Sequence, residues 1–241
     1  IAIIDTGLDT DHQSFDPLAF AVALAEDAGY ADMDYEEYLK AIDVLDEEEI
    51  TEALPKLNAS ARYSGLTASD LYINLKAPFG FCYIDRDLDV THDKDAQGEH
   101  GSHVAGIATA NAYIPNEDGT FSPALDTVKT QGVAPDAQLI TMKVFGKGGG
   151  AYESDYLVAI EDAIVLDCDA VNMSLGAPNP GNTRHEESYY QNILDNLAKS
   201  DIVMTVSAGN AGAWPEYGYH GAGLLYHGDV SMQTAGTPGT Y

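Results

Sequence analysis

Short apolar runs alternate with amphipathic stretches along most of this 241-residue chain. The apolar runs are short and end at polar or turn-forming residues, which is typical of buried parallel strands. We expect strands at residues 1–5, 79–84, 138–144, 170–174 and 202–207. Helical spacing follows at 154–166, with Ser154 as the expected N-cap, and at 186–199. This alternation predicts an α/β fold of three layers, a mostly parallel central sheet with helices on both faces.

An acidic region interrupts this rhythm. Two stretches within it, Met33–Leu45 and Glu47–Leu54, have helical spacing and strong negative charge, and Pro55 is expected to interrupt the second. We interpret them as exposed helices of an acidic insertion that occupies about residues 12–97. The insertion belongs to a single domain over residues 1–241, whose last part, 211–241, is a loop-rich tail.

The whole chain is strongly acidic, with 39 Asp and Glu against 11 Lys and Arg, a net charge of −28 and a pI near 4.1. This charge excludes nucleic acid as a partner, because phosphate binding needs clustered Lys and Arg. It also argues against binding to anionic membranes. No apolar run approaches the roughly 18 residues of a membrane-spanning helix, so we expect no membrane insertion of this segment. An acidic surface fits an extracellular protein or cation binding, and simple solvation explains it as well.

Three carboxylates suggest where a cation could bind. Asp85, Asp87 and Asp89 alternate along the chain, so on a strand all three would face one way and could hold Ca²⁺. A solvated acidic edge is the alternative interpretation. The two cysteines, Cys82 and Cys168, form no disulfide framework and are expected to be small buried residues.

Catalytic chemistry is indicated by residues 99–106, which read Glu-His-Gly-Ser-His-Val-Ala-Gly. They place His100 at the start of a helix whose glycines allow close packing. A general base needs a fixed imidazole with a carboxylate on one ring nitrogen and a nucleophile near the other. Asp5, at the end of the first expected strand, offers that carboxylate. Ser174 and Asn210 also lie at or just after expected strand ends, where sites of parallel sheets are found.

Four segments in this order closely resemble the subtilisin-like serine proteases, or subtilases: residues 3–9, 100–106, 171–176 and 206–210. The resemblance implies that Asp5 orients His100, that His100 moves the proton of a serine, and that Asn210 stabilises the oxyanion. It also implies which residues flank an extended polypeptide substrate. They are Gly148, Gly149, Gly150, Ser174, Leu175 and Gly176, with Ala208 and Gly209 walling the pocket for the side chain before the cut bond.

Each assignment has a structural alternative. Asp5 could cap a turn, His100 could serve only as a helix N-cap, and Asn210 could be a turn residue. The three glycines could form a plain flexible loop. Ser174 belongs to the substrate-binding strand of the family and is not the expected nucleophile. His103 is expected to be a buried structural histidine, since the base of the family matches the first histidine of the motif.

One part of the family pattern is missing. The Gly-Thr-Ser-Met-Ala-like segment that carries the nucleophile does not occur, and Gly236-Thr237-Pro238 matches only its first two residues. In the family the serine comes last in the chain, so we expect residues 1–241 to be a trimmed segment that is inactive alone. The remainder of its own chain would then carry the serine.

The large insertion and acidic composition look most like the bacterial cell-envelope, lactocepin-like proteinases, in which a further domain precedes the nucleophile. The resemblance then implies an extracellular or cell-envelope serine endopeptidase that needs no cofactor for its chemistry, with structural Ca²⁺ as an option. Two alternatives stay open: a non-catalytic binding module with the subtilase fold, and an acidic calcium-binding surface module.

Overall fold

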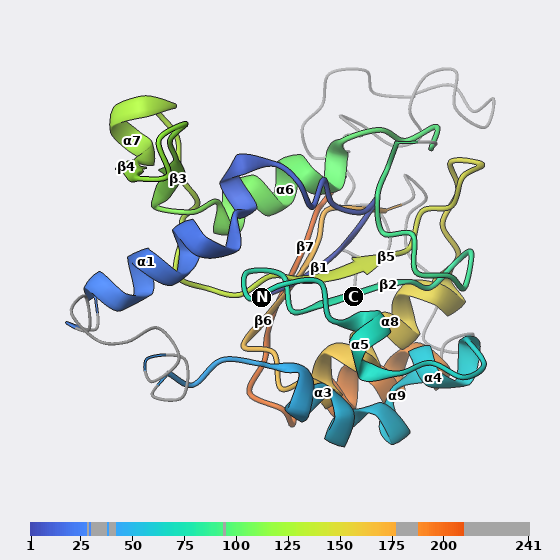
Figure 1. Cartoon of the computed structure of the whole chain (residues 1–241). Coiled ribbons are helices and arrows are strands. Elements are labelled where there is room, and N and C mark those ends of the chain that lie inside the picture. Colours follow the sequence, from blue (N-terminus) through green and yellow to red (C-terminus); the bar gives the residue numbers. More distant parts are fainter. Residues whose placement is uncertain (28, 30–37, 39–41, 94, 177–187, 210–241) are drawn as a thin grey trace, which may run out of the picture.

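In the part of the chain that the structure describes, five parallel strands form the central sheet (Figure 1). The computed structural model describes residues 1–27, 29, 38, 42–93, 95–176 and 188–209. In spatial order the strands are β2 (Phe79–Cys82), β5 (Ile140–Lys143), β1 (Ala2–Asp5), β6 (Ala170–Met173) and β7 (Val203–Val206). Every pairing between neighbours is parallel. Each strand lies inside an expected apolar run, so the prediction of a parallel sheet is confirmed.

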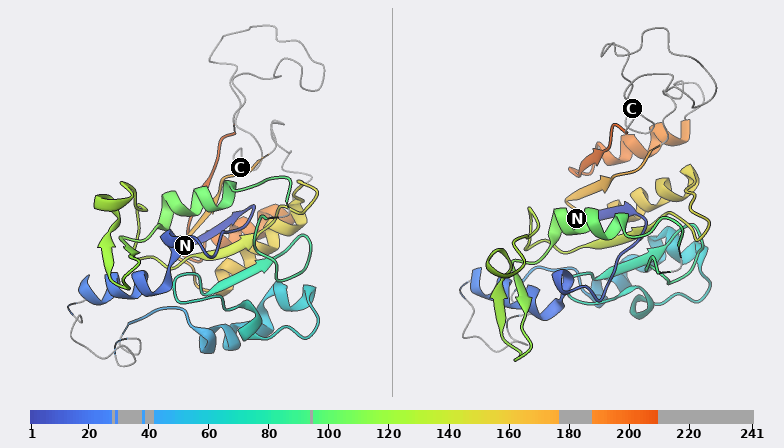
Figure 2. Two further views of the ribbon diagram at one scale, coloured as in Figure 1. Left: turned by 45° about the horizontal axis from the view of Figure 1, so that its top comes forward. Right: turned by 90° about the horizontal axis from the view of Figure 1, so that it is seen from above.

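The alternation of side chains along β1 explains the layers. Ile3 points to one face, where it joins a cluster with Ala105 of α6 (His100–Thr109). Ala2 and Ile4 point to the other face and join the main core. That core includes side chains of α8 (Glu153–Val165) and α9 (Ser188–Leu197). The sheet therefore has helices on both faces, as expected for three layers (Figure 1 and Figure 2).

The start of α8 differs from the prediction. The N-cap is Tyr152, which makes no side-chain capping bond, and Ser154 lies inside the helix. The first turn instead carries Glu153 and Asp155, whose charges favour the N-terminal end of the helix dipole. The prediction that Ser154 caps this helix is therefore wrong.

The acidic region contains the second of its two expected helices. α3 (Glu47–Ala53) begins with a capping box between Asp46 and Glu49. It gives way to the 3-10 helix η2 (Leu54–Lys56), which contains Pro55, so the expected interruption is confirmed. Most of the other expected helix, residues 33–37 and 39–41, lies outside the described residues. The span 12–97 also contains β2 and therefore supplies a strand of the central sheet as well as helices.

A buried carboxylate joins this region to the main core. Asp162 of α8 accepts hydrogen bonds from the first backbone N–H groups of α4 (Asn58–Arg62), 2.6 Å from Asn58 and 3.0 Å from Ala59. It also accepts from the hydroxyl of Tyr83 at 2.9 Å. Burial raises the pKa of Asp162, and these donors act against that rise. α4 is thereby capped by another helix and fixed against it.

A hairpin that the hydrophobic pattern did not predict lies beside α1 (Pro17–Asp27). Strands β3 (Tyr113–Pro115) and β4 (Phe121–Pro123) pair antiparallel around Gly119, whose φ of +81° suits a tight turn. The available signal was the Asp-Gly pair at the tip. Other short helices among the described residues are η1 (Gln13–Phe15), α5 (Ala68–Leu71) and α7 (Ala124–Thr127).

Two further expectations concern single residues and the membrane. Cys82 and Cys168 are both buried and unpaired, as expected. No helix in the described ranges has the length and apolar character needed to cross a lipid bilayer.

Candidate active site

The carboxyl edge of the sheet gathers most of the expected site residues. Because the strands are parallel, the segments that follow them leave from the same edge. β1 ends at Asp5, and the glycines at 148–150 follow β5. Residues 174–176 follow β6, and residues 208–209 follow β7. Asn210 comes next in the chain but lies outside the described residues.

Asp5 and His100 form a hydrogen-bonded pair. Nδ1 of His100 lies 2.7 Å from Oδ1 of Asp5. The Asp5 side chain is 1% exposed, whereas the His100 side chain is 52% exposed. The pair therefore has a fixed carboxylate inside and an imidazole at the surface. With Nδ1 occupied, Nε2 is the ring nitrogen left for proton transfer.

The charge of the Asp5 carboxylate depends on the groups that donate hydrogen bonds to it. Its Oδ1 also accepts from the backbone N–H of Thr6 at 2.7 Å, while Oδ2 is buried and has no hydrogen-bond partner among the described residues. Burial raises the pKa of the Asp5 carboxyl, and the hydrogen bonds from His100 and Thr6 act in the opposite direction. The two donors therefore favour the charged form of Asp5, which is the form that a cationic imidazole needs.

Thr6 is a site residue that the motif analysis missed. Its hydroxyl accepts a hydrogen bond from the backbone N–H of Gly101 at 2.8 Å and donates to the carbonyl of Gly98 at 3.1 Å. The N-cap residue of α6, Glu99, makes no side-chain capping bond. Thr6 therefore supplies the missing cap from another segment and fixes the helix that carries His100. Its position beside Asp5 at a strand end did not by itself indicate this role.

Two glycines allow close approaches at the end of β1, Gly101 from α6 and Gly7 toward Val90. A Cβ on Gly101 would lie 2.3 Å from the carbonyl oxygen of Gly7 and 2.9 Å from its nitrogen. Gly7 itself has a φ of +117°, and a Cβ there would lie 2.3 Å from the carbonyl oxygen of Val90. The expectation that glycines after His100 allow close packing is confirmed for Gly101.

Replacing Gly101 with alanine should destabilise the protein by about 1–3 kcal/mol, the usual range for overpacking, because the new methyl group meets backbone atoms. The matched control is Gly106→Ala in the same helix. A Cβ there meets no atom within 4 Å, so this change should be neutral or stabilising by up to about 1 kcal/mol. Urea unfolding of both variants measures the difference. Equal stabilities would contradict the close approach of α6 and β1.

The segments expected to flank a substrate are ordered by local hydrogen bonds. Residues 146–150 close on themselves, since the N–H of Gly149 donates to the carbonyl of Gly146 at 2.8 Å. Gly149 has a φ of +85°, so this turn requires glycine. The hydroxyl of Ser174 donates to Asn172 at 3.0 Å. Ser207 ties β7 to the segment after β6 through its hydroxyl, which donates to the carbonyl of Leu175 at 3.0 Å.

The three aspartates considered for calcium do not lie on a strand. Residues 83–86 form a turn, so Asp85 and Asp89 are not placed on one face by strand alternation. Asp85 accepts from the backbone N–H of Lys147 at 3.2 Å, and Asp87 pairs with the Lys147 ammonium at 3.3 Å. In the part of the chain that the structure describes, no group of three acidic, His or Cys residues could hold a metal ion. The strand arrangement on which this candidate site depended is wrong.

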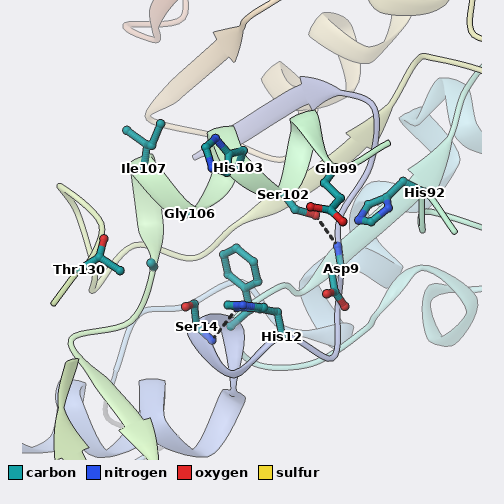
Figure 3. A pocket seen from close by; sticks show the side chains of 12 residues that line it. Asp9, His12, Ser14, His92, Glu99, Ser102, His103, Gly106, Ile107 and Thr130 are labelled. Carbon is teal, nitrogen blue, oxygen red and sulfur yellow. Dashed lines mark hydrogen bonds between the residues drawn. The ribbon is translucent and has the colours of Figure 1, made fainter. Parts of the chain in front are cut away.

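A pocket of about 280 Å³ lies against α6 (Figure 3). His103 lines it and is exposed, so the expectation of a buried structural histidine is wrong. His12 and His92 line the same pocket. At its wall the backbone N–H of Asp9 donates to the hydroxyl of Ser102 at 2.7 Å, which joins the loop after β1 to α6.

Comparison with known proteins finds relatives of this chain. Residues 1–241 match the subtilase family. The PI-type proteinase of Lactococcus lactis subsp. cremoris is 37% identical over 172 residues, which are 70% of this chain and 8% of that protein. The minor extracellular protease Vpr of Bacillus subtilis (strain 168) is 30% identical over 59% of this chain and 16% of its own. Among solved structures, sphericase covers 88% of this chain and 46% of its own, with 22% identity and a TM-score of 0.43. The chain therefore belongs to the subtilase family, and its expected likeness to the bacterial cell-envelope proteinases is confirmed.

Proposed function

We propose that this chain is part of the catalytic domain of a serine endopeptidase that hydrolyses peptide bonds in extended polypeptides. The observation that carries the proposal is the 2.7 Å hydrogen bond between buried Asp5 and surface-facing His100. Family membership supports the same reaction. The chain spans 8% of the length of the lactococcal proteinase, so the remainder of its own chain is proposed to carry the nucleophilic serine.

In this mechanism His100 takes the serine proton on Nε2 and returns it to the leaving amine. Asp5 holds the imidazole in the required tautomer and stabilises its cationic form without accepting the proton. Asn210 is proposed to donate its side-chain amide to the oxyanion of the tetrahedral intermediate. The substrate backbone would pair with the segments at 148–150 and 174–176, with 208–209 beside the pocket. No cofactor takes part in these steps, and a structural Ca²⁺ is left without assigned residues.

The proposed location is outside the cell or in the cell envelope. The likeness to the extracellular protease Vpr and to the lactococcal proteinase supports it. It can be tested by fractionating the producing cells and probing for the chain with an antibody, and recovery from the cytoplasmic fraction alone would contradict it.

Labelling with a fluorophosphonate tests the proposed reaction. The full-length protein should be labelled and should cleave an unfolded polypeptide, whereas residues 1–241 alone should do neither. If the folded full-length protein is neither labelled nor active, the endopeptidase proposal fails and a non-catalytic binding module is the better interpretation.

Replacing Asn210 with alanine in the full-length protein should lower kcat by about 10²–10³-fold with little change in KM, because the amide acts on the oxyanion and not on the bound substrate. Asn116→Ala is the control: its side chain bonds within the β3–β4 hairpin, 2.9 Å from both Thr120 and Ser122, and kcat should be unchanged. Steady-state kinetics on a peptide substrate measures both. A loss confined to KM would contradict the assigned role.

A further inference from the structure

We propose that Lys143 and Asp95 are positioning residues, which hold the segment before His100 in the place that catalysis requires. The proposal rests on the proposed endopeptidase function and adds two residues that the family motifs do not include. Neither side chain is assigned to contact the substrate. Both are proposed to act through His100 and through the glycine turn at 146–150.

The two residues form a deeply buried ion pair. Lys143 is the last residue of β5 and lies opposite Asp5 of β1 in the register of the sheet. Its side chain is 2% exposed, and that of Asp95 is 4% exposed. The Lys143 ammonium binds the Asp95 carboxylate and also donates to the carbonyl of Thr91. A charge buried to this degree is costly unless it is paired, so each residue requires the other.

The segment that Lys143 holds contacts the glycine turn and the residue that caps α6. Asp95 comes five residues before His100. Two residues after Asp95, the Gln97 side chain donates to the carbonyl of Gly149 in the glycine turn. Gly98 then accepts from the Thr6 hydroxyl that caps α6.

Residues 95–98 therefore form a brace between α6, the end of β1 and the glycine turn. The ion pair is the anchor of this brace in the sheet. The Lys143 side chain passes Gly7 on its way to Asp95, and a Cβ on Gly7 would stand 3.4 Å from the lysine Cδ. The end of β1 and the brace are therefore packed around the same side chain. Displacing residues 95–98 would move His100 relative to a substrate held along the glycine turn. A displacement of about 1 Å in such a geometry costs about 10²-fold in rate.

The decisive variant is the full-length protein with Lys143→Met and Asp95→Leu together. Replacing both members of a buried ion pair with apolar residues is often neutral for stability, whereas removing one leaves an unpaired buried charge. The double variant should thus remain folded but lose the anchor. The matched control is Arg62→Met with Asp155→Leu, which removes the 2.5 Å ion pair between α4 and α8, where side chains are 16% and 9% exposed.

For the double variant we expect kcat to fall by about 10- to 100-fold while KM stays within about twofold, whereas the control pair should keep its wild-type kcat. A double variant that is as stable as the wild type and equally active would overturn the proposal. A control that loses as much kcat would also overturn it, because the effect would then be a general result of removing an ion pair.

A readout that does not need turnover separates this inference from the proposed function. The N–H of Gly101 bonds to Thr6 at the start of α6, and its hydrogen exchange should become at least about tenfold faster in the double variant than in the wild type. Unchanged protection would overturn the brace even if the wild-type protein proved inactive. If the double variant does not fold, Asp95→Glu keeps both charges and lengthens one side chain by a methylene. It should lower kcat several-fold with KM unchanged, and wild-type kcat in this variant would count against the proposal.

Discussion

Replacing His100 with alanine in the full-length protein is expected to lower kcat by about 10⁶-fold, the order found when subtilisin loses its histidine. The imidazole is the group that the structure places between a buried carboxylate and the surface, 2.7 Å from Asp5 and 52% exposed. Without it no group is assigned to accept the serine proton. Binding of an extended peptide should persist, because the substrate is expected to lie along backbone segments and not on the imidazole.

The control for this change is His103→Ala. His103 lies one turn further along α6, is exposed and lines the pocket of Figure 3. Its variant should keep kcat within about tenfold of the wild type, since the residue has no assigned part in proton transfer. Single-turnover kinetics and equilibrium peptide binding distinguish the two variants. Similar losses in both would contradict the assignment of the base to the first histidine of the motif.

The sequence was sufficient to predict the Asp5–His100 pair for a physical reason. Asp5 ends a buried strand and His100 begins a helix, and a parallel sheet brings such ends to one edge. Local patterns set both positions and the resemblance to the subtilases pairs them, so the path of the 94 residues between them was not needed. The five strands were predictable on the same basis, because each is a short apolar run between turn-forming residues.

Features that depend on long-range geometry could not be inferred in this way. Thr6 caps α6 only because the end of β1 meets the start of that helix, and no local signal distinguishes it from an ordinary turn residue. The partner of Lys143 lies 48 residues earlier, on an irregular segment whose course the hydrophobic pattern does not define. The cap of α8 was mistaken because Ser154 is a favourable N-cap residue, but Tyr152 takes that position.

The error over the aspartates has a similar origin. The expected strand ended at Ile84, and the alternation of Asp85, Asp87 and Asp89 would align them only if they lay on a strand themselves. β2 ends at Cys82, and Arg86 follows with a φ of +56°. A non-glycine residue in that region marks a turn, which a count of alternating charges does not detect.

Asp5→Asn is expected to lower kcat by about 10⁴-fold while leaving KM nearly unchanged. The reason lies in the two hydrogen bonds to Oδ1, from Thr6 and from His100. If the asparagine oxygen keeps this position, the amide NH₂ takes the place of Oδ2. That position is buried and offers no hydrogen-bond partner among the described residues, so the NH₂ is left without an acceptor there. If the amide flips, its NH₂ faces the Thr6 N–H and gives His100 the tautomer that cannot accept the serine proton on Nε2. Both orientations also remove the charge that stabilises the imidazolium.

The matched control is Asp11→Asn, an exposed aspartate six residues further along the same segment, which should leave kcat unchanged. Combining Asp5→Asn with His100→Ala makes the test stricter. Since Asp5 is assigned to act only through His100, the double variant should be no slower than His100→Ala alone. A further drop in the double variant would mean that the buried carboxylate has a second role in the reaction. Steady-state kinetics of the four proteins of this cycle, the wild type included, measures that difference directly.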